Sequence, residues 1–498
     1  MNFGIIRNIL GKLMVIVACL MVLPLIVSLI YQEGINYYIA FLIPIAGLLL
    51  IGFLFNIKKP KDNTIVAKEG LIIVAASWLI MSLFGCLPFI ISKDIPNFFD
   101  AFFEIVSGFT TTGASVVTNV EGLSKSVVFW RSFSHWIGGM GVLIFVLAII
   151  PESKEGSSVH IMRAESPGPT VGKLVSKMRA TTRILYLIYL CLSAILLLFL
   201  WLGPDKKMDF FSSLIYTFGT AGTGGFAIDS LSLELYLPYS QYVIAIFMIL
   251  FGINFTAFYL ILIGKVKEAF DNEEIKLYFT IIVVAVAILC LSTFKIYNNF
   301  EETFRHSLFQ VASIISTTGY TSTGYSVIET FGDYSRVVGW PIIAQVVIVM
   351  LMFCGACAGS TAGGLKVTRI NILFKSIFRK IKSVVNPRKV EVITVDKQVL
   401  DNNTVEVVLS YFILYMFLLI ACTFIVSLDG YDLVTNFTAS LSCISNIGPG
   451  LNAVGPYGSF SIFSPLSKFT LSLLMIAGRL ELFPLLVLFN PKTWKRYS

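Results

Sequence analysis

The amino-acid sequence predicts an all-α polytopic membrane protein with ten transmembrane helices. We expect four span–pore-loop–span repeats in a pseudo-fourfold arrangement, preceded by two extra helices. Of the 498 residues, 56% are hydrophobic and only 13% are charged, whereas a soluble domain carries about 25% charged residues. This composition excludes a soluble enzyme and a disordered protein. Two patterns then define the architecture: ten long apolar runs, and a glycine-rich segment that recurs four times.

The apolar runs have about the 20 residues that a helix needs to cross a bilayer. They cover residues 13–30, 38–56, 71–92, 127–150, 181–202, 240–263, 277–294, 337–353, 405–428 and 466–489. An even number of spans places both termini on one side, and most of the 37 Lys and Arg residues fall on that side. Because basic loops stay in the cytoplasm, we expect both termini there. The net charge of +8 therefore reflects topology, and no nucleic-acid partner is expected.

The runs divide the chain into five parts. We expect a two-span extension at 1–69, repeats at 70–178 and 179–274, a third repeat with a broken gating helix at 275–400, and a fourth repeat at 401–498. Between its two spans, each repeat carries a shorter semi-apolar stretch that suits a re-entrant helix. An acidic residue near the start of each stretch is expected to cap that helix. These residues are Asp100, Asp209, Glu301 and Asp432.

Each short stretch ends in a glycine-rich segment. The four segments read SGFTTTGAS (107–115), TAGTGGFA (220–227), ISTTGYTS (315–322) and ISNIGPGL (444–451), and they align on Gly113, Gly224, Gly319 and Gly448. In the second segment, Gly222 and Gly225 compete with Gly224 for the alignment. One such motif alone is more typical of an ordinary turn, but four at the same architectural position indicate a repeated functional unit.

These segments have the chemistry of a site for a monovalent cation. Four extended strands around one axis can aim consecutive backbone carbonyls at the centre, where the carbonyls replace the water shell of the ion. Glycine permits the positive φ that such a strand needs. The segments contain no carboxylate, which a divalent-ion site would favour. The candidate ligands are the carbonyls of Thr111, Thr112, Gly113, Gly222, Thr223, Gly224, Thr317, Thr318, Gly319, Asn446, Ile447 and Gly448.

Together with three further motifs, these segments resemble the Trk/Ktr/HKT superfamily of potassium transporters. The motifs are HWIGGMGVLIFVLAIIP (135–151), CAGSTAGGLKVTR (357–369) and GRLELFPLLVLFNP (478–491). The length and the two extra spans are similar to the bacterial Trk-type potassium uptake membrane subunit. The fourth segment departs from the Thr-Thr-Gly pattern, because it reads Asn446-Ile447-Gly448-Pro449.

The resemblance carries several expectations. It implies potassium uptake across the bacterial inner membrane, with K⁺ as the transported ion and no prosthetic group. It also implies a pseudo-fourfold pore in each chain, a homodimer embedded in membrane lipid, and a cytosolic nucleotide-binding ring as regulatory partner. Because the segments lack the longer TVGYG sequence of potassium channels, we expect weaker discrimination between K⁺ and Na⁺.

One span differs from the others in its glycine content. After the apolar run 337–353, residues 354–364 carry Gly355, Gly359, Gly363 and Gly364 beside Ser360 and Thr361, and Lys366 lies two residues further on. Each glycine costs a helix about 1 kcal/mol relative to alanine, so we expect a loop that crosses the cavity below the carbonyls as a gate. The resemblance assigns the same role. The alternative is a GxxxG helix-packing face at Gly359 and Gly363.

Arg479 lies midway along the last apolar run, where a charge is costly and usually functional. In the resembling family, an arginine in this GRLE context faces the pore, where its charge repels cations. The alternative is a structural salt bridge, for example with Glu481.

Two other classes of protein compete with a channel-like transporter. An enzyme is disfavoured because the three histidines form no nucleophile–base pattern. A cation-coupled symporter, which uses the energy of an H⁺ or Na⁺ gradient for K⁺ uptake, remains the stronger alternative.

Overall fold

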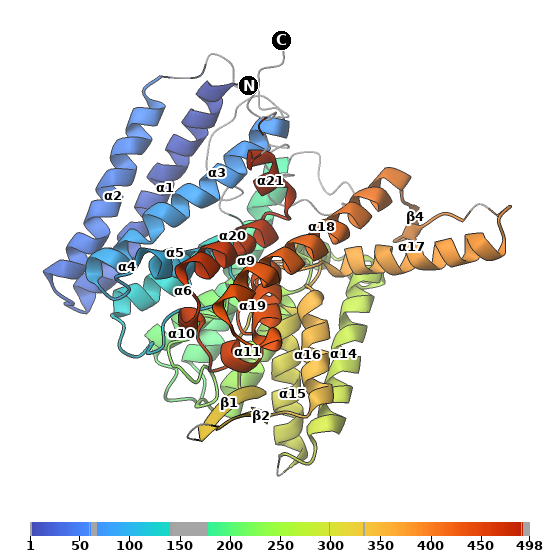
Figure 1. Cartoon of the computed structure of the whole chain (residues 1–498). Helices are drawn as coiled ribbons and strands as arrows, with labels where there is room; N and C mark the ends of the chain where they lie inside the picture. The colour runs from blue at the N-terminus through green and yellow to red at the C-terminus, as the bar shows by residue number, and fades with distance from the viewer. Residues whose placement is uncertain are drawn as a thin grey trace.

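The computed structural model is mostly α-helical, with very little β-strand (Figure 1). It describes residues 2–491, with the exception of 59, 61–66, 140, 142–177, 298, 332–333, 390 and 490. Residues 140 and 142–150 of the predicted span 127–150, and residues 151–177 of the basic segment after it, therefore lie outside the described part of the chain.

Two long helices form the N-terminal extension. Helices α1 (Phe3–Ile30) and α2 (Ile35–Asn56) run side by side along one flank of the molecule, as the blue ribbons of Figure 1 show. They cross where both are glycine: a Cβ atom on Gly52 would lie 2.9 Å from the carbonyl oxygen of Gly11. Small residues at a crossing allow the close backbone approach that drives helix association in lipid.

Most of the remaining helices form four successive triplets. Each triplet consists of a first helix, a short second helix and a third helix. The triplets are α3 (Ala67–Gly85), α5 (Phe98–Phe109) and α6 (Lys125–Gly139); α9 (Met178–Trp201), α10 (Phe210–Gly222) and α11 (Pro238–Phe251); α14 (Glu273–Thr293), α15 (Phe300–Ile315) and α16 (Ile342–Phe353); and α18 (Asn402–Val426), α19 (Leu433–Ser445) and α20 (Pro465–Arg479).

Further elements lie within, between and after these triplets. The helices are α4 (Leu87–Ser92), α12 (Phe255–Leu262), α13 (Val266–Asp271), α17 (Val367–Val385) and α21 (Phe483–Phe489). Two small antiparallel hairpins, β1 (Ser326–Phe331) with β2 (Tyr334–Gly339) and β3 (Thr394–Val395) with β4 (Gln398–Val399), are the strands of the described residues. The first hairpin pairs Ser326 with Gly339, so β2 occupies the start of the predicted span 337–353 and α16 begins only at Ile342.

The caps of the short helices correct part of the sequence-based prediction. Asp209 and Asp432 are N-caps, because their carboxylates accept hydrogen bonds from the backbone N–H groups of Ser212 (2.7 Å) and Thr435 (3.0 Å). In the other two short helices the caps are Asn97 and Asn299. Asp100 and Glu301 instead lie in the first turn, where a negative charge still interacts favourably with the helix dipole.

The third helices of the second, third and fourth triplets are broken, which the sequence predicted for the third triplet alone. Helix α11 meets α12 at a bend of 91°, α16 stops before residues 354–366, and α20 stops before Glu481 and Leu482, which both have positive φ. Among the described residues, six helices are long and apolar enough to span a membrane, or seven if α11 and α12 are counted as one span. The predicted continuous spans 240–263 and 466–489 are therefore wrong in this respect.

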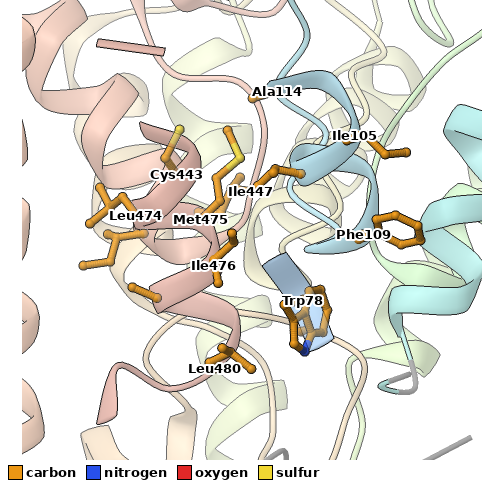
Figure 2. Packing of buried hydrophobic residues seen from close by; sticks show 14 of the residues in the cluster. Trp78, Ile105, Phe109, Ala114, Cys443, Ile447, Leu474, Met475, Ile476 and Leu480 are labelled. Carbon is orange, nitrogen blue, oxygen red and sulfur yellow. The ribbon is translucent and has the colours of Figure 1, made fainter. Parts of the chain in front are cut away.

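The short second helices lie in the centre of the molecule. Nearly every residue of α5, α10, α15 and α19 beyond the first turn is buried, including serine and threonine side chains. Figure 2 shows part of this packing, with Ile447 beside Met475 of α20 and close to α5, which carries Ile105 and Phe109. The four short helices therefore end inside the protein, and the segments after their C-termini are enclosed.

Candidate functional site

Four segments with one shared backbone pattern come directly after the short helices. In each, a residue in the left-handed region is followed, two positions on, by a glycine with positive φ. The pairs are Thr111 and Gly113 (φ 55° and 79°), Thr223 and Gly225 (56° and 78°), Thr317 and Gly319 (57° and 87°), and Asn446 and Gly448 (55° and 106°). We call residues 111–113, 223–225, 317–319 and 446–448 the ring segments.

The backbone corrects the alignment of the second segment. Gly225, not Gly224, has the positive φ of the other three glycines, while Gly222 is still the last residue of α10. The hydrogen bonds agree, because the N–H groups of Thr112, Gly224, Thr318 and Ile447 each donate to the carbonyl five residues earlier, at 2.8–3.0 Å. Because three of the four residues 222–225 are glycine, the sequence alone could not decide which of them aligns with the glycines of the other segments.

The ring segments close on one another. A Cβ atom on Gly113 would lie 2.0 Å from the carbonyl oxygen of Gly224, one on Gly225 would lie 2.0 Å from that of Thr318, and one on Gly319 would lie 2.0 Å from that of Ile447. A Cβ atom on Gly448 would lie 2.8 Å from the carbonyl oxygen of Thr112, which returns the contacts to the first segment. The four segments therefore form a closed ring in which side chains are sterically excluded at the glycines.

An open cavity lies at this ring. It has a volume of about 160 Å³, and all four positive-φ glycines line it. Beyond the glycines its wall includes Ser115, Arg131 and Asp229. The ring thus faces a space that is shared by all four triplets and that is wide enough for water molecules or a hydrated ion.

The electrostatics of the ring favour a cation. Each short helix directs its partly negative C-terminal end at the ring. The N–H groups of the middle ring residues donate hydrogen bonds to carbonyls of these helices. Among the described residues there is no group of three or more His, Cys, Asp and Glu side chains that would hold a metal ion. Such an environment suits a monovalent ion held by main-chain oxygens.

A closed loop lies against this ring. Residues 354–366 leave α16 and return beside it, since Gly355 N–H donates to the Leu365 carbonyl (2.8 Å) and Val367 N–H donates to the Ala356 carbonyl (3.2 Å). The alternative of a GxxxG helix-packing face is therefore excluded, because the segment is not helical. Gly359 and Gly364 have positive φ, and Ser360 donates to the Cys357 carbonyl at 2.7 Å.

The loop contacts the ring directly. The Gly363 N–H donates to the hydroxyl of Thr317 at 2.8 Å. A Cβ atom on Gly363 would lie 2.6 Å from the Ser445 carbonyl oxygen, and one on Gly355 would lie 2.3 Å from the Gly363 carbonyl oxygen. Glycine at both positions allows the loop to pack tightly between the third and fourth ring segments.

Arg479 ties the loop to the first triplet. Its guanidinium donates to the carbonyls of Thr361 (2.7 Å), Gly138 (2.5 Å) and Gly139 (2.7 Å). Glu481 forms an ion pair with Arg369 of α17, and buried Lys366 donates to the Ala362 carbonyl. Positive charge is therefore concentrated around the loop.

Sequence reasoning missed a buried anchor of the loop. Glu274, in the first turn of α14, is 5% exposed and accepts hydrogen bonds from Ala358 N–H (2.7 Å) and Thr368 N–H (3.1 Å). One carboxylate oxygen thus holds Ala358 within the loop and Thr368 just after it. No motif marks this glutamate, because the Asn-Glu-Glu that starts α14 is typical of an ordinary helix N-terminus.

A helical membrane protein in which four buried backbone segments close into one ring beside a shared cavity has the design of an ion-transport protein. A family model described as TrkH, cation transport protein, matches residues 39–496. The chain belongs to this family, whose members are transporters and not enzymes.

Individual relatives cover the whole chain. The Trk system potassium uptake protein TrkH of Escherichia coli (strain K12) is 32% identical over 505 residues, which cover 99% of this chain and 100% of the relative. The Trk system potassium uptake protein TrkG of the same strain is 27% identical over 99% of this chain and 98% of the relative. The crystal structure of the potassium transporter TrkH from Vibrio parahaemolyticus superposes with a TM-score of 0.86 at 29% identity, and covers 99% of this chain and 100% of that chain.

The ring geometry predicts that Gly319 tolerates no side chain. We expect Gly319→Ala to lower cation uptake by at least tenfold, because its Cβ atom would displace the Ile447 carbonyl. The matched control is Gly430→Ala, which has a similar φ of 81° but no atom within 4 Å. That control carries only the backbone cost, roughly 1–2 kcal/mol. Uptake of a radioactive K⁺ analogue into transport-deficient cells compares the two, and equal uptake by both variants would contradict the ring.

Proposed function

We propose that this protein takes up potassium across the bacterial inner membrane through the ring segments. The closure of four segments into one ring is the observation that carries this proposal, and the names of the relatives supply the ion. Carbonyls of residues 111–113, 223–225, 317–319 and 446–448 replace the water shell of K⁺. In the second segment this set includes Gly225, in addition to Thr223 and Gly224 from the sequence.

In this proposal the four triplets are repeats around a pseudo-fourfold axis. Each third helix belongs to the second span of its repeat, which gives ten spans in all and leaves both termini in the cytoplasm. The boundaries 70–178, 179–274, 275–400 and 401–498 belong to the same proposal. A homodimer and a cytosolic nucleotide-binding regulatory ring are further proposals, supported by the resemblance to Trk systems.

The alternative is coupled symport of K⁺ with H⁺ or Na⁺. Purified protein in proteoliposomes with opposed K⁺ and pH gradients separates the two, because a channel-like pathway reverses at the K⁺ equilibrium potential. We expect reversal there, unmoved by the pH gradient. A reversal potential that shifts with pH would favour symport with H⁺, one that shifts by a fixed coupling ratio with an imposed Na⁺ gradient would favour symport with Na⁺, and absence of any K⁺ flux would contradict the proposed function itself.

In this proposal the loop 354–366 acts as the gate, and Arg479 holds it in the closed position. Arg479 contributes a positive charge in the ion path and also fastens the loop to α6 through three carbonyls. Both effects oppose cation passage while the loop remains in place.

Two substitutions of Arg479 separate the effect of its positive charge from the effect of its hydrogen bonds to the loop and to α6. We expect Arg479→Ala to raise K⁺ flux in proteoliposomes several-fold, because both effects are lost. Arg479→Lys keeps the charge but loses the planar fork that reaches three carbonyls. Low flux in Arg479→Lys would indicate an electrostatic barrier, and high flux would indicate a mechanical lock. Unchanged flux in both variants would contradict the gate.

Glu274 offers an independent test of the same loop. We expect Glu274→Gln to raise flux, since a neutral amide replaces the charged acceptor that holds Ala358 and Thr368. Hydrogen bonds to a charged group contribute about 1.5–3 kcal/mol. The matched control is the neighbouring Glu273→Gln, whose half-exposed carboxylate pairs with Lys375 away from the loop. Equal flux in the two variants would show that Glu274 does not hold the gate.

A further inference from the structure

A buried ion pair stands behind the first ring segment. Arg131 of α6 and Glu104 of α5 are 1% and 0% exposed, and their closest atoms, Nη2 and Oε1, are 2.6 Å apart. The Arg131 Nε also donates to Glu104 at 2.8 Å. Removing two charges from solvent is costly, and loss of one partner would leave the other as an uncompensated buried charge.

The pair holds the chain directly beyond Gly113. Glu104 accepts hydrogen bonds from the Ser115 hydroxyl and from the Val116 N–H, both at 2.9 Å. Arg131 Nη2 donates to the same Ser115 hydroxyl at 3.1 Å. Three charge-assisted hydrogen bonds therefore fix residues 115–116 against α5 and α6.

Arg131 also reaches the second ring segment. Its guanidinium carbon lies 4.2 Å from the ring centroid of Phe226, the residue directly after Gly225. The ring centroid of His135, one turn later on α6, lies 4.2 Å from that of Phe226. The Phe226 N–H donates to His135 Nε2 (3.3 Å), while His135 Nδ1 donates to the Gly108 carbonyl (2.7 Å). One face of α6 thus contacts the outer ends of two ring segments.

The other ring segments have neutral support. At the position of Glu104 relative to the ring glycine stand Tyr216, Gln310 and Ala439. Tyr216 donates to the Ser232 carbonyl (3.2 Å), and Gln310 donates to the Thr321 hydroxyl (2.8 Å). In the fourth triplet the hydroxyl of Thr438 accepts from the Leu451 N–H (3.0 Å). Within the described residues, only the first triplet places an ion pair at this point.

We propose that Arg131 is a positioning residue that sets the ion discrimination of the ring. The inference rests on the proposed potassium function. A smaller ion such as Na⁺ requires the carbonyls to move inward, and Arg131 opposes that movement in two adjacent segments through Glu104 and Phe226. The ion pair therefore preserves a ring of the size that suits K⁺.

The test is the permeability ratio of K⁺ to Na⁺ in proteoliposomes. We expect Arg131→Gln to lower the ratio at least fivefold, and Arg131→Lys, which keeps the charge, to restore it in part. Arg131→Gln leaves Glu104 as a buried unpaired charge and can fail to fold. The double variant Glu104→Gln/Arg131→Gln removes both charges and keeps the measurement available, with monodisperse elution in detergent as the check on folding.

The control is Arg305→Gln, which breaks an arginine–glutamate pair inside α15, between Arg305 and Glu301. We expect it to leave the ratio unchanged. A wild-type ratio in the folded Arg131 variants, or an equal fall in Arg305→Gln, would overturn the inference. A wild-type protein that conducts no K⁺ would instead overturn the proposed function, so the two failures are distinguishable.

Discussion

Main-chain packing at four glycines constrains the centre of this molecule. Each ring glycine lies so close to a carbonyl of the next segment that no side chain fits between them. Such packing requires four short helices to end at one point, and these helices are accordingly buried almost along their whole length. The surrounding first and third helices then shield the enclosed polar backbone from lipid, where unpaired groups would be costly.

The break after α16 leaves the loop 354–366 packed against the ring. The loop 354–366 receives contacts from all four triplets: Arg479 joins it to the first and fourth, the Gly252 carbonyl accepts from Cys357 N–H in the second, and Thr317 accepts from Gly363 in the third. Opening such a loop requires several polar contacts to be exchanged together. Losing only some of these contacts would leave buried polar groups unsatisfied, which is costly in a low-dielectric interior.

Much of this architecture was predictable from periodicity and repetition. Apolar runs predicted the long helices, and four glycine-rich segments predicted the ring, since both depend on local chemistry. Three features were not predictable, because each depends on distant parts of the chain. Gly225 replaces Gly224 because register depends on where α10 ends, the bend after Phe251 depends on contacts with Gly359, and Glu274 acquires its partners only through tertiary packing. Asn97 and Asn299 are the N-caps in place of the nearby acidic residues. The sequence could place these helix starts only to within about one turn, so it did not distinguish the two kinds of residue.

The central claim is that main-chain oxygens from four parts of one chain surround a dehydrated monovalent cation. Anomalous diffraction from crystals soaked in Rb⁺ or Tl⁺, which replace K⁺ but scatter anomalously, tests it most directly. The account predicts a peak on the axis between Thr112, Gly224, Thr318 and Ile447. Absence of a peak there, with ordered ring segments and ion bound elsewhere in the protein, would contradict it.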